Sequence, residues 1–124
     1  MLSSCFKPLM TEAELKEKLV KDFKKLKIKA DFDLVIKGYS SKFFGRYNPN
    51  NKRLFLYIYP YPEQTFMYPY EEIFLTFLHE VCHCIQHNDH TFVRVKGIMH
   101  NKDFYALYDG LVQKAIKSKI IKRV

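Results

Sequence analysis

The chain carries His79-Glu80-Val81-Cys82-His83 in the second half of a long apolar stretch. In an α-helix, two histidines four residues apart lie on one face, about 6 Å apart along the axis. Both imidazoles can then bind one metal ion, and the glutamate beside the first can act on a water molecule at that ion. This arrangement predicts a zinc-dependent hydrolase site, with His79 and His83 as Zn²⁺ ligands and Glu80 as general base. The alternative is an ordinary amphipathic helix with two surface histidines.

The residues before and after these histidines have the pattern of one long helix. Pro69 suits the first position of a helix, and Glu71 and Glu72 favour its positive N-terminal end. We expect the helix to end near Asn88-Asp89. Its apolar residues recur at helical spacing and predict a broad buried face: Ile73, Phe74, Phe77, Leu78, Val81 and Ile85.

Upstream, the pattern predicts one helix followed by three strands. Thr11-Glu12-Ala13-Glu14 has the sequence of a capping box, so a first helix should run from there to about Leu26. Strands are predicted at 33–39, 43–47 and 53–59, and the last two should form a hairpin around Asn48-Pro49-Asn50-Asn51. The apolar residues that recur at helical spacing in the first helix are Leu15, Leu19, Val20, Phe23 and Leu26.

A last helix should start at Asn101 or Lys102. The order of elements is then helix, three strands, helix, helix, which predicts an α+β fold with a three-stranded antiparallel sheet. The residues of this last helix that should face the core are Phe104, Leu107, Leu111, Val112 and Ile116.

Size and composition indicate one globular domain spanning residues 1–124, because 48% of the residues are hydrophobic. No apolar run approaches the ~20 residues that cross a bilayer, and the N-terminus lacks the apolar core of a secretion signal. Three cysteines, Cys5, Cys82 and Cys84, suit a reducing compartment, and the last two should pack inside a helix. We therefore expect a cytoplasmic protein with no membrane partner.

The formal net charge of +8 has two interpretations. Lysines and arginines concentrated in residues 16–29 and 114–123 can bind the phosphates of DNA, since this releases counterions and raises affinity. They can equally form a solvated face on two terminal helices. No fingerprint of a nucleic-acid module decides between these alternatives.

A catalytic zinc site usually has three protein ligands and a fourth position open to water. No glutamate follows Glu80, which excludes a downstream glutamate as the third ligand. A compact alternative needs a glycine three residues after His83 and a ligand six residues after it, but these positions hold Gln86 and Asp89, so the required glycine is missing. His87 lies two turns beyond His79, about 12 Å along the helix axis, and cannot share its ion. His90 lies in the following loop and would require the chain to fold straight back. His100 is the better candidate, because it directly precedes the last helix, which can return alongside the first two ligands.

Two motifs of the chain together resemble those of the SprT-like zinc metallopeptidases. The first is His79-Glu80-x-x-His83, and the second, after a gap in the mid-teens, is His100-Asn101-Lys102-Asp103-Phe104. The resemblance covers about residues 43–111 and implies a minimal zincin-like domain, in which Gly45-Arg46-Tyr47 belongs to the hairpin before the active-site helix. It implies zinc ligands at His79, His83 and His100, a catalytic glutamate at Glu80 and a packing aromatic at Phe104. Asn101 replaces the family's glycine, and the family's frequent C-terminal zinc ribbon is absent.

The resemblance further implies hydrolysis of peptide bonds by a zinc-bound water that Glu80 activates. The protein or peptide substrate should pair with an exposed strand edge, for which we choose 53–59. Tyr105 or Tyr108 would stabilise the oxyanion. The resemblance suggests DNA-associated proteins as substrates. The alternatives are a zinc-binding, DNA-associated module with little or no turnover and a peptidase for free proteins. The sequence predicts no oligomeric state.

Overall fold

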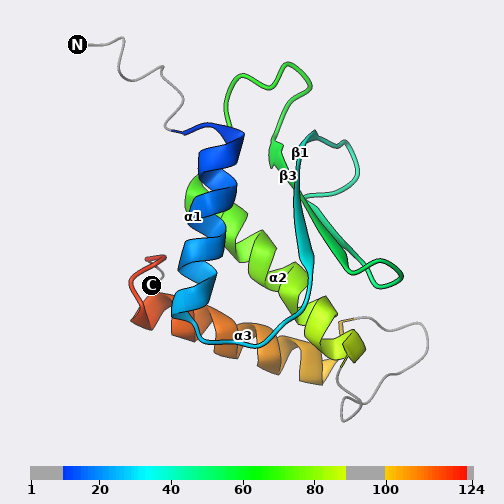
Figure 1. Ribbon diagram of the computed structural model, residues 1–124, viewed down its shortest axis with the longest axis vertical. Coiled ribbons are helices and arrows are strands. Elements are labelled where there is room, and N and C mark those ends of the chain that lie inside the picture. Colours follow the sequence, from blue (N-terminus) through cyan, green and yellow to red (C-terminus); the bar gives the residue numbers. More distant parts are fainter. Residues whose placement is uncertain (1–9, 89–99, 123–124) are drawn as a thin grey trace.

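The computed structural model describes residues 10–88 and 100–122, which form three helices and a three-stranded sheet (Figure 1). The predicted α+β class and the predicted order of elements are confirmed. In chain order the elements are α1 (Glu12–Lys25), β1 (Asp33–Tyr39), β2 (Gly45–Asn48), β3 (Arg53–Tyr59), α2 (Tyr70–Asn88) and α3 (Lys102–Lys117).

Helix α1 begins at the predicted capping box. The Thr11 hydroxyl accepts a 3.1 Å hydrogen bond from the backbone N–H of Glu14, whose carboxylate accepts one of 2.8 Å from the N–H of Thr11. Of the apolar residues that recur at helical spacing in this helix, Val20 is the exposed one, at 37%. Residue 20 is rotated by about 100° from Leu19, which is fully buried, and therefore points to solvent.

The sheet is mixed, with strand order β1-β3-β2. Strands β2 and β3 form the expected antiparallel hairpin, which aligns Gly45 with Leu56. Strand β1 pairs with β3 in the parallel sense, aligning Leu34 with Leu54, so the prediction of a purely antiparallel sheet is wrong. The chain reaches this arrangement by crossing from β1 to the far edge, where it forms β2, and then returning through the centre as β3.

The central place of β3 corrects a second prediction. Both of its edges are already paired, so residues 53–59 offer no edge to a substrate. Strand β2 begins at Gly45, two residues later than predicted. Phe44, just before it, is nevertheless hydrogen-bonded to β3, because its carbonyl accepts a 2.9 Å hydrogen bond from the Tyr57 N–H. Among the described residues, the outer edge of β2 pairs with no other strand, and this is the free edge beside α2.

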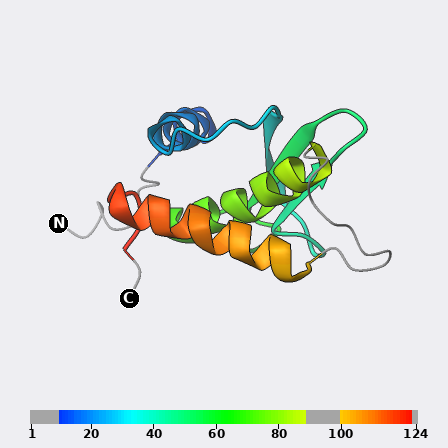
Figure 2. The same cartoon turned by 90° about the horizontal axis from the view of Figure 1, so that it is seen from below.

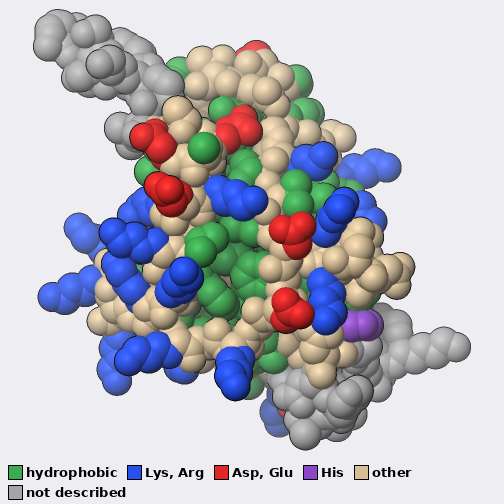
Figure 3. Space-filling model, viewed as in Figure 1, with side chains coloured by type: hydrophobic (Ala, Val, Ile, Leu, Met, Phe, Trp, Pro, Cys, Tyr) green, Lys and Arg blue, Asp and Glu red, His purple; other side chains and the backbone are tan. Residues whose placement is uncertain are grey.

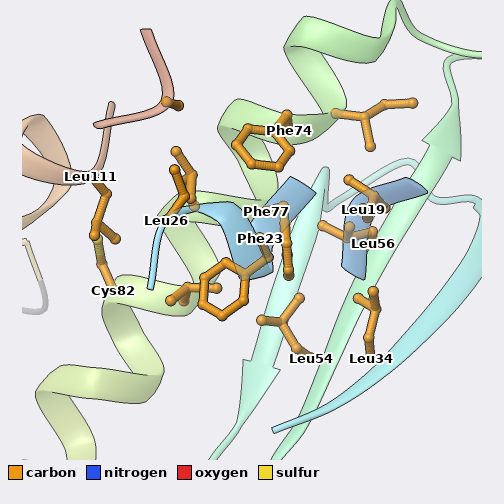
Figure 4. Close-up of a cluster of buried hydrophobic side chains, with 14 of the residues drawn as sticks. Leu19, Phe23, Leu26, Leu34, Leu54, Leu56, Phe74, Phe77, Cys82 and Leu111 are labelled. Carbon is orange, nitrogen blue, oxygen red and sulfur yellow. The ribbon is translucent and has the colours of Figure 1, made fainter. Parts of the chain in front are cut away.

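Helices α1 and α2 cover the same face of the sheet, and α3 packs against α2 (Figures 1 and 2). In β3, Leu54, Leu56 and Ile58 alternate with less buried residues and point into this layer. Figure 4 shows aromatic rings from both helices meeting these leucines; the Phe23 and Phe77 ring centroids lie 5.4 Å apart. The core therefore fixes α2 between the sheet on one side and α3 on the other.

Several smaller predictions are also decided. Cys82 and Cys84 are buried in α2 as expected, whereas Cys5 lies outside the described residues. Helix α2 is described as far as Asn88, the last residue before the gap at 89–99, so its predicted end near Asn88-Asp89 is not tested. Pro69 immediately precedes the helix instead of occupying its first position, and its carbonyl accepts a hydrogen bond from the Ile73 N–H. In the part of the chain that the structure describes, no helix combines the length and the apolar character needed to span a bilayer.

Candidate metal centre

Helix α2 and the start of α3 bring three histidines together. His79 and His83 project from one face of α2, and His100 lies two residues before α3. The Nε2 atom of His100 lies 3.1 Å from that of His79 and 3.0 Å from that of His83. The ligand atoms of all three side chains lie within 4.8 Å of one another, so the three histidines form a group that can hold a metal ion.

The spacing of these nitrogens fits zinc. With Zn–N bonds of about 2.0–2.1 Å, neighbouring ligands of a tetrahedral site lie about 3.3 Å apart. Direct hydrogen bonding is a poor alternative, since one imidazole nitrogen acts either as a donor or as an acceptor. His100 Nε2 faces two other nitrogens at hydrogen-bonding distance, and only a shared cation uses all three lone pairs.

The electrostatic environment favours the neutral form of two of the three histidines. Burial, together with the neighbouring His79 and His100, lowers the pKa of His83 to about 4. Burial and then the proximity of His100 also lower the pKa of His79. A neutral imidazole has a lone pair available for a metal, so these rings are ready to bind a cation at neutral pH.

The two other histidines have different positions. His87 is exposed near the end of α2 and is not part of the group, as the helical spacing predicts. His90, the other candidate for the third ligand, lies outside the described residues.

A fully buried phenylalanine, Phe104, packs against all three histidine rings. The ring centroid of Phe104 lies 5.0 Å from that of His79, 4.7 Å from His83 and 4.8 Å from His100. Contact with all three rings restricts the directions that the imidazoles can adopt. This is the packing position that the sequence pattern assigned to this residue.

The first turn of α3 is capped by Asn101. Its Oδ1 accepts a 3.0 Å hydrogen bond from the Phe104 N–H, and its backbone is extended, with φ −92° and ψ −175°. The position therefore requires no left-handed backbone, and asparagine serves here as an N-cap. A second donor, Nε2 of the buried Gln86, lies 3.4 Å from the same oxygen. The sequence gives no local indication of this contact, because fifteen residues separate its partners.

Glu80 lies on the side of α2 that faces β2. Only 6% of its surface is exposed, and burial raises the pKa of its carboxyl group to about 7. A pKa near neutrality suits a group that must accept a proton and later release it. Gly45 of β2 approaches so closely that a Cβ there would lie 3.0 Å from Glu80 Cγ.

A cleft of about 360 Å³ opens beside His79 and Glu80. Tyr108 lines this cleft, with its ring centroid 5.8 Å from that of His79. Tyr105 is 57% exposed, lies beside His100 and does not line the cleft. Of the two tyrosines expected to stabilise an oxyanion, the geometry thus favours Tyr108. The remaining lining is Lys42, Phe43, Phe44, Gly45, Leu75 and Thr76.

No protein-family model matches the sequence, and neither does any curated protein. Among solved structures, the chain is similar to the crystal structure of Wss1 from Saccharomyces cerevisiae, with a TM-score of 0.59 and 22% sequence identity. The alignment covers 87% of this chain and 77% of the Wss1 chain. The chain has a small zincin-like fold. At this identity the likeness concerns the fold alone, and the chemistry rests on the three histidines and Glu80.

Proposed function

We propose that the protein is a zinc-dependent metallopeptidase of the SprT-like type. One observation carries the proposal: the Nε2 atoms of His79, His83 and His100 converge beside a buried glutamate at the wall of an open cleft. A purely structural zinc site is usually closed and has no need of an adjacent carboxylate. Two further facts support the type: the residue pattern from His79 to Phe104, and the fold shared with Wss1, a SprT-like metalloprotease.

Each residue of the site has a distinct role in the proposed reaction. His79, His83 and His100 would hold Zn²⁺, which supplies polarisation of the scissile carbonyl and acidification of a water molecule. Glu80 accepts a proton from the attacking water and delivers it to the departing amine. Tyr108 donates a hydrogen bond to the oxyanion from the cleft wall.

The substrate that fits the cleft is an extended polypeptide segment. The free edge of β2 lies beside the site and can pair with one more strand, whereas residues 53–59 of β3 are already paired on both sides. Phe43, Phe44 and Leu75 make much of the wall apolar, and Phe44 is 65% exposed. We therefore infer that the segment presents an apolar side chain next to the bond that is cleaved.

DNA-associated proteins remain our proposal for the natural substrates. Lysine side chains gather over α1, on the left of Figure 3, away from the metal centre. A positively charged surface can hold the phosphates of DNA without occupying the cleft. If this surface binds DNA, affinity should fall steeply as salt increases, and charge reversal at Lys16, Lys21 and Lys24 should weaken it. Binding that is insensitive to both changes would favour a peptidase for free proteins.

The decisive experiment combines metal analysis with proteolysis. The purified protein should contain one zinc per chain and cleave a denatured, labelled protein. Glu80→Gln should retain zinc but lose ~10²–10⁴-fold in cleavage rate, the usual contribution of a general base. Glu17→Gln, an exposed change on α1, is the matched control and should behave as wild type. Zinc binding without cleavage of free or DNA-bound protein would instead indicate the binding module without turnover.

A further inference from the structure

We propose that Gln86 is a positioning residue for the third metal ligand, acting through the side chain of Asn101. The inference rests on the proposed metal site. Gln86 lies in α2, three residues after His83, and Asn101 directly follows His100. A hydrogen bond between these two side chains therefore connects the helix that carries two ligands to the segment that carries the third.

Donor and acceptor chemistry fixes the orientation of both amides. The backbone N–H of Phe104 requires an acceptor, so the atom of Asn101 that faces it is Oδ1. Gln86 has to offer a donor to this oxygen, and its Nε2 lies 3.4 Å away. A carboxamide oxygen has two lone pairs and can accept both bonds. Asn101 Oδ1 therefore accepts both the N-cap hydrogen bond of α3 and the hydrogen bond from α2.

The location of Gln86 supports this role. It is one of three buried polar or charged residues among those that the structure describes, together with Asp22 and Glu80. Burial of an amide is unfavourable unless it is hydrogen-bonded, so the contacts of Gln86 hold it in one orientation. His100 lies just before α3, a separate element, and this segment has to be placed within a fraction of an ångström for His100 to meet the other two rings.

The test uses the full chain and measures metal binding alone. Zinc affinity is obtained by competition with a chromophoric chelator, and the metal-free proteins are checked by circular dichroism. Gln86→Met keeps the length and helix propensity of the side chain but removes the donor. We expect it to weaken zinc binding ~10–100-fold, as is typical when a group that orients a ligand is lost. Gln113→Met, at an exposed position of α3, is the matched control and should not change affinity.

Two further measurements distinguish positioning from general destabilisation. Asn101→Asp retains acceptors for the hydrogen bonds from the Phe104 N–H and from Gln86, so it should keep the wild-type zinc affinity. Asn101→Ala removes the acceptor and should weaken zinc binding. In the Asn101→Ala background, Gln86→Met should cause little further loss, because the two residues act as one unit. The visible absorption of the Co²⁺-loaded protein should change in Gln86→Met, since that spectrum reports the ligand geometry.

The possible failures are distinct. Wild-type protein that binds no zinc would overturn the proposed function. Wild-type protein that binds zinc, with an unchanged affinity in Gln86→Met, would overturn only the positioning role. If Gln86→Met does not fold, Asn101→Ser decides, because serine caps the helix but is too short to reach Gln86 as well. Wild-type affinity in Asn101→Ser would contradict the proposal, and weakened binding would support it.

Discussion

Gly45 of β2 lies directly against Glu80 of α2. A Cβ atom at residue 45 would lie 3.0 Å from Glu80 Cγ and 2.8 Å from Thr76 Cγ2, closer than real Cβ contacts normally are. The missing side chain therefore sets the distance between the strand and the helix at the cleft. Since Glu80 and Gly45 both line that cleft, the same contact controls where the proposed general base points.

Gly45→Ala should impair catalysis more than it impairs metal binding. The added methyl group has to displace Thr76 or Glu80, and overpacking of this kind costs about 1–3 kcal/mol of stability. We expect a lower melting temperature and a reduced kcat. Zinc affinity should change little, because the three atoms nearest to the added Cβ belong to Thr76, Glu80 and Phe55 and to none of the three histidines. Thermal unfolding, zinc titration and a cleavage assay measure the three quantities.

Two other variants serve as controls for this prediction. Gly110 lies in α3 with nothing within 4 Å of an added Cβ, so Gly110→Ala should gain about 0.5–1 kcal/mol from helix propensity. Thr76→Ser removes the nearest methyl group and should restore part of the activity of Gly45→Ala. If Gly45→Ala cleaves substrate as well as wild type does, the contact has no influence on Glu80.

The identity of the third ligand is tested by two histidine variants. His100→Ala should lose most bound zinc, because its Nε2 is the atom that faces both other ligands. His87→Ala should retain zinc, since that side chain is exposed and outside the group. For wild type and His87→Ala, free zinc at a hundred times Kd should add about 2.7 kcal/mol to the free energy of unfolding. If His87→Ala loses zinc and His100→Ala retains it, His87 rather than His100 is the third ligand.

The two tyrosines near the centre should respond differently to loss of their hydroxyl groups. Tyr108→Phe should lower kcat by ~10²-fold with little change in KM, which is the effect of removing an oxyanion donor. Tyr105→Phe should have near wild-type kinetics, because Tyr105 does not line the cleft. Both variants should bind zinc normally. Equal losses in the two variants, or a loss confined to Tyr105→Phe, would contradict this assignment.

Features that depend on neighbouring residues were predictable from the sequence. The start of α1 follows from the Thr11–Glu14 capping box, and the start of α3 follows from Asn101 as an N-cap. The pairing of His79 with His83 follows from helical geometry alone. In each case the interacting groups are three or four residues apart, so the local pattern contains the whole interaction.

Features that depend on distant contacts were not predictable in this way. Both β1 and β2 pair with β3, but the alternation of apolar residues does not reveal which edge or which direction each strand takes. The substrate edge was misassigned for this reason. The burial of Glu80 and its contact with Gly45 also require the finished fold, although the family resemblance did place Gly45 in the hairpin before the active-site helix.

A network of ion pairs and one hydrogen bond around the buried Asp22 joins α1 to the start of α2. The Tyr70 hydroxyl donates a 2.6 Å hydrogen bond to the carboxylate of Asp22, which also pairs with Lys18 and Lys25. Burial alone would raise the pKa of Asp22, but the Tyr70 hydrogen bond and the two ammonium groups outweigh it. The pKa of Asp22 is therefore held below its ordinary value of 3.8. The network contributes stability that is present above the pKa of the unfolded state and is lost as pH falls through the lower folded pKa.

Tyr70→Phe should reveal this contribution. The variant keeps the ring, which lies under the Lys18 ammonium at 4.6 Å, and removes only the hydroxyl donor. Loss of a hydrogen bond to a charged group costs about 1.5–3 kcal/mol, so the variant should be less stable at pH 7. In Tyr70→Phe the pKa of Asp22 should move back upward, and the stability of the variant should therefore depend less on pH below about 4.

Denaturant unfolding from pH 7 to pH 2 measures both the loss of stability and its pH dependence, and Tyr61→Phe at an exposed site is the control. Equal pH slopes for Tyr70→Phe and wild type would mean that Lys18 and Lys25, rather than the Tyr70 hydroxyl, lower the pKa.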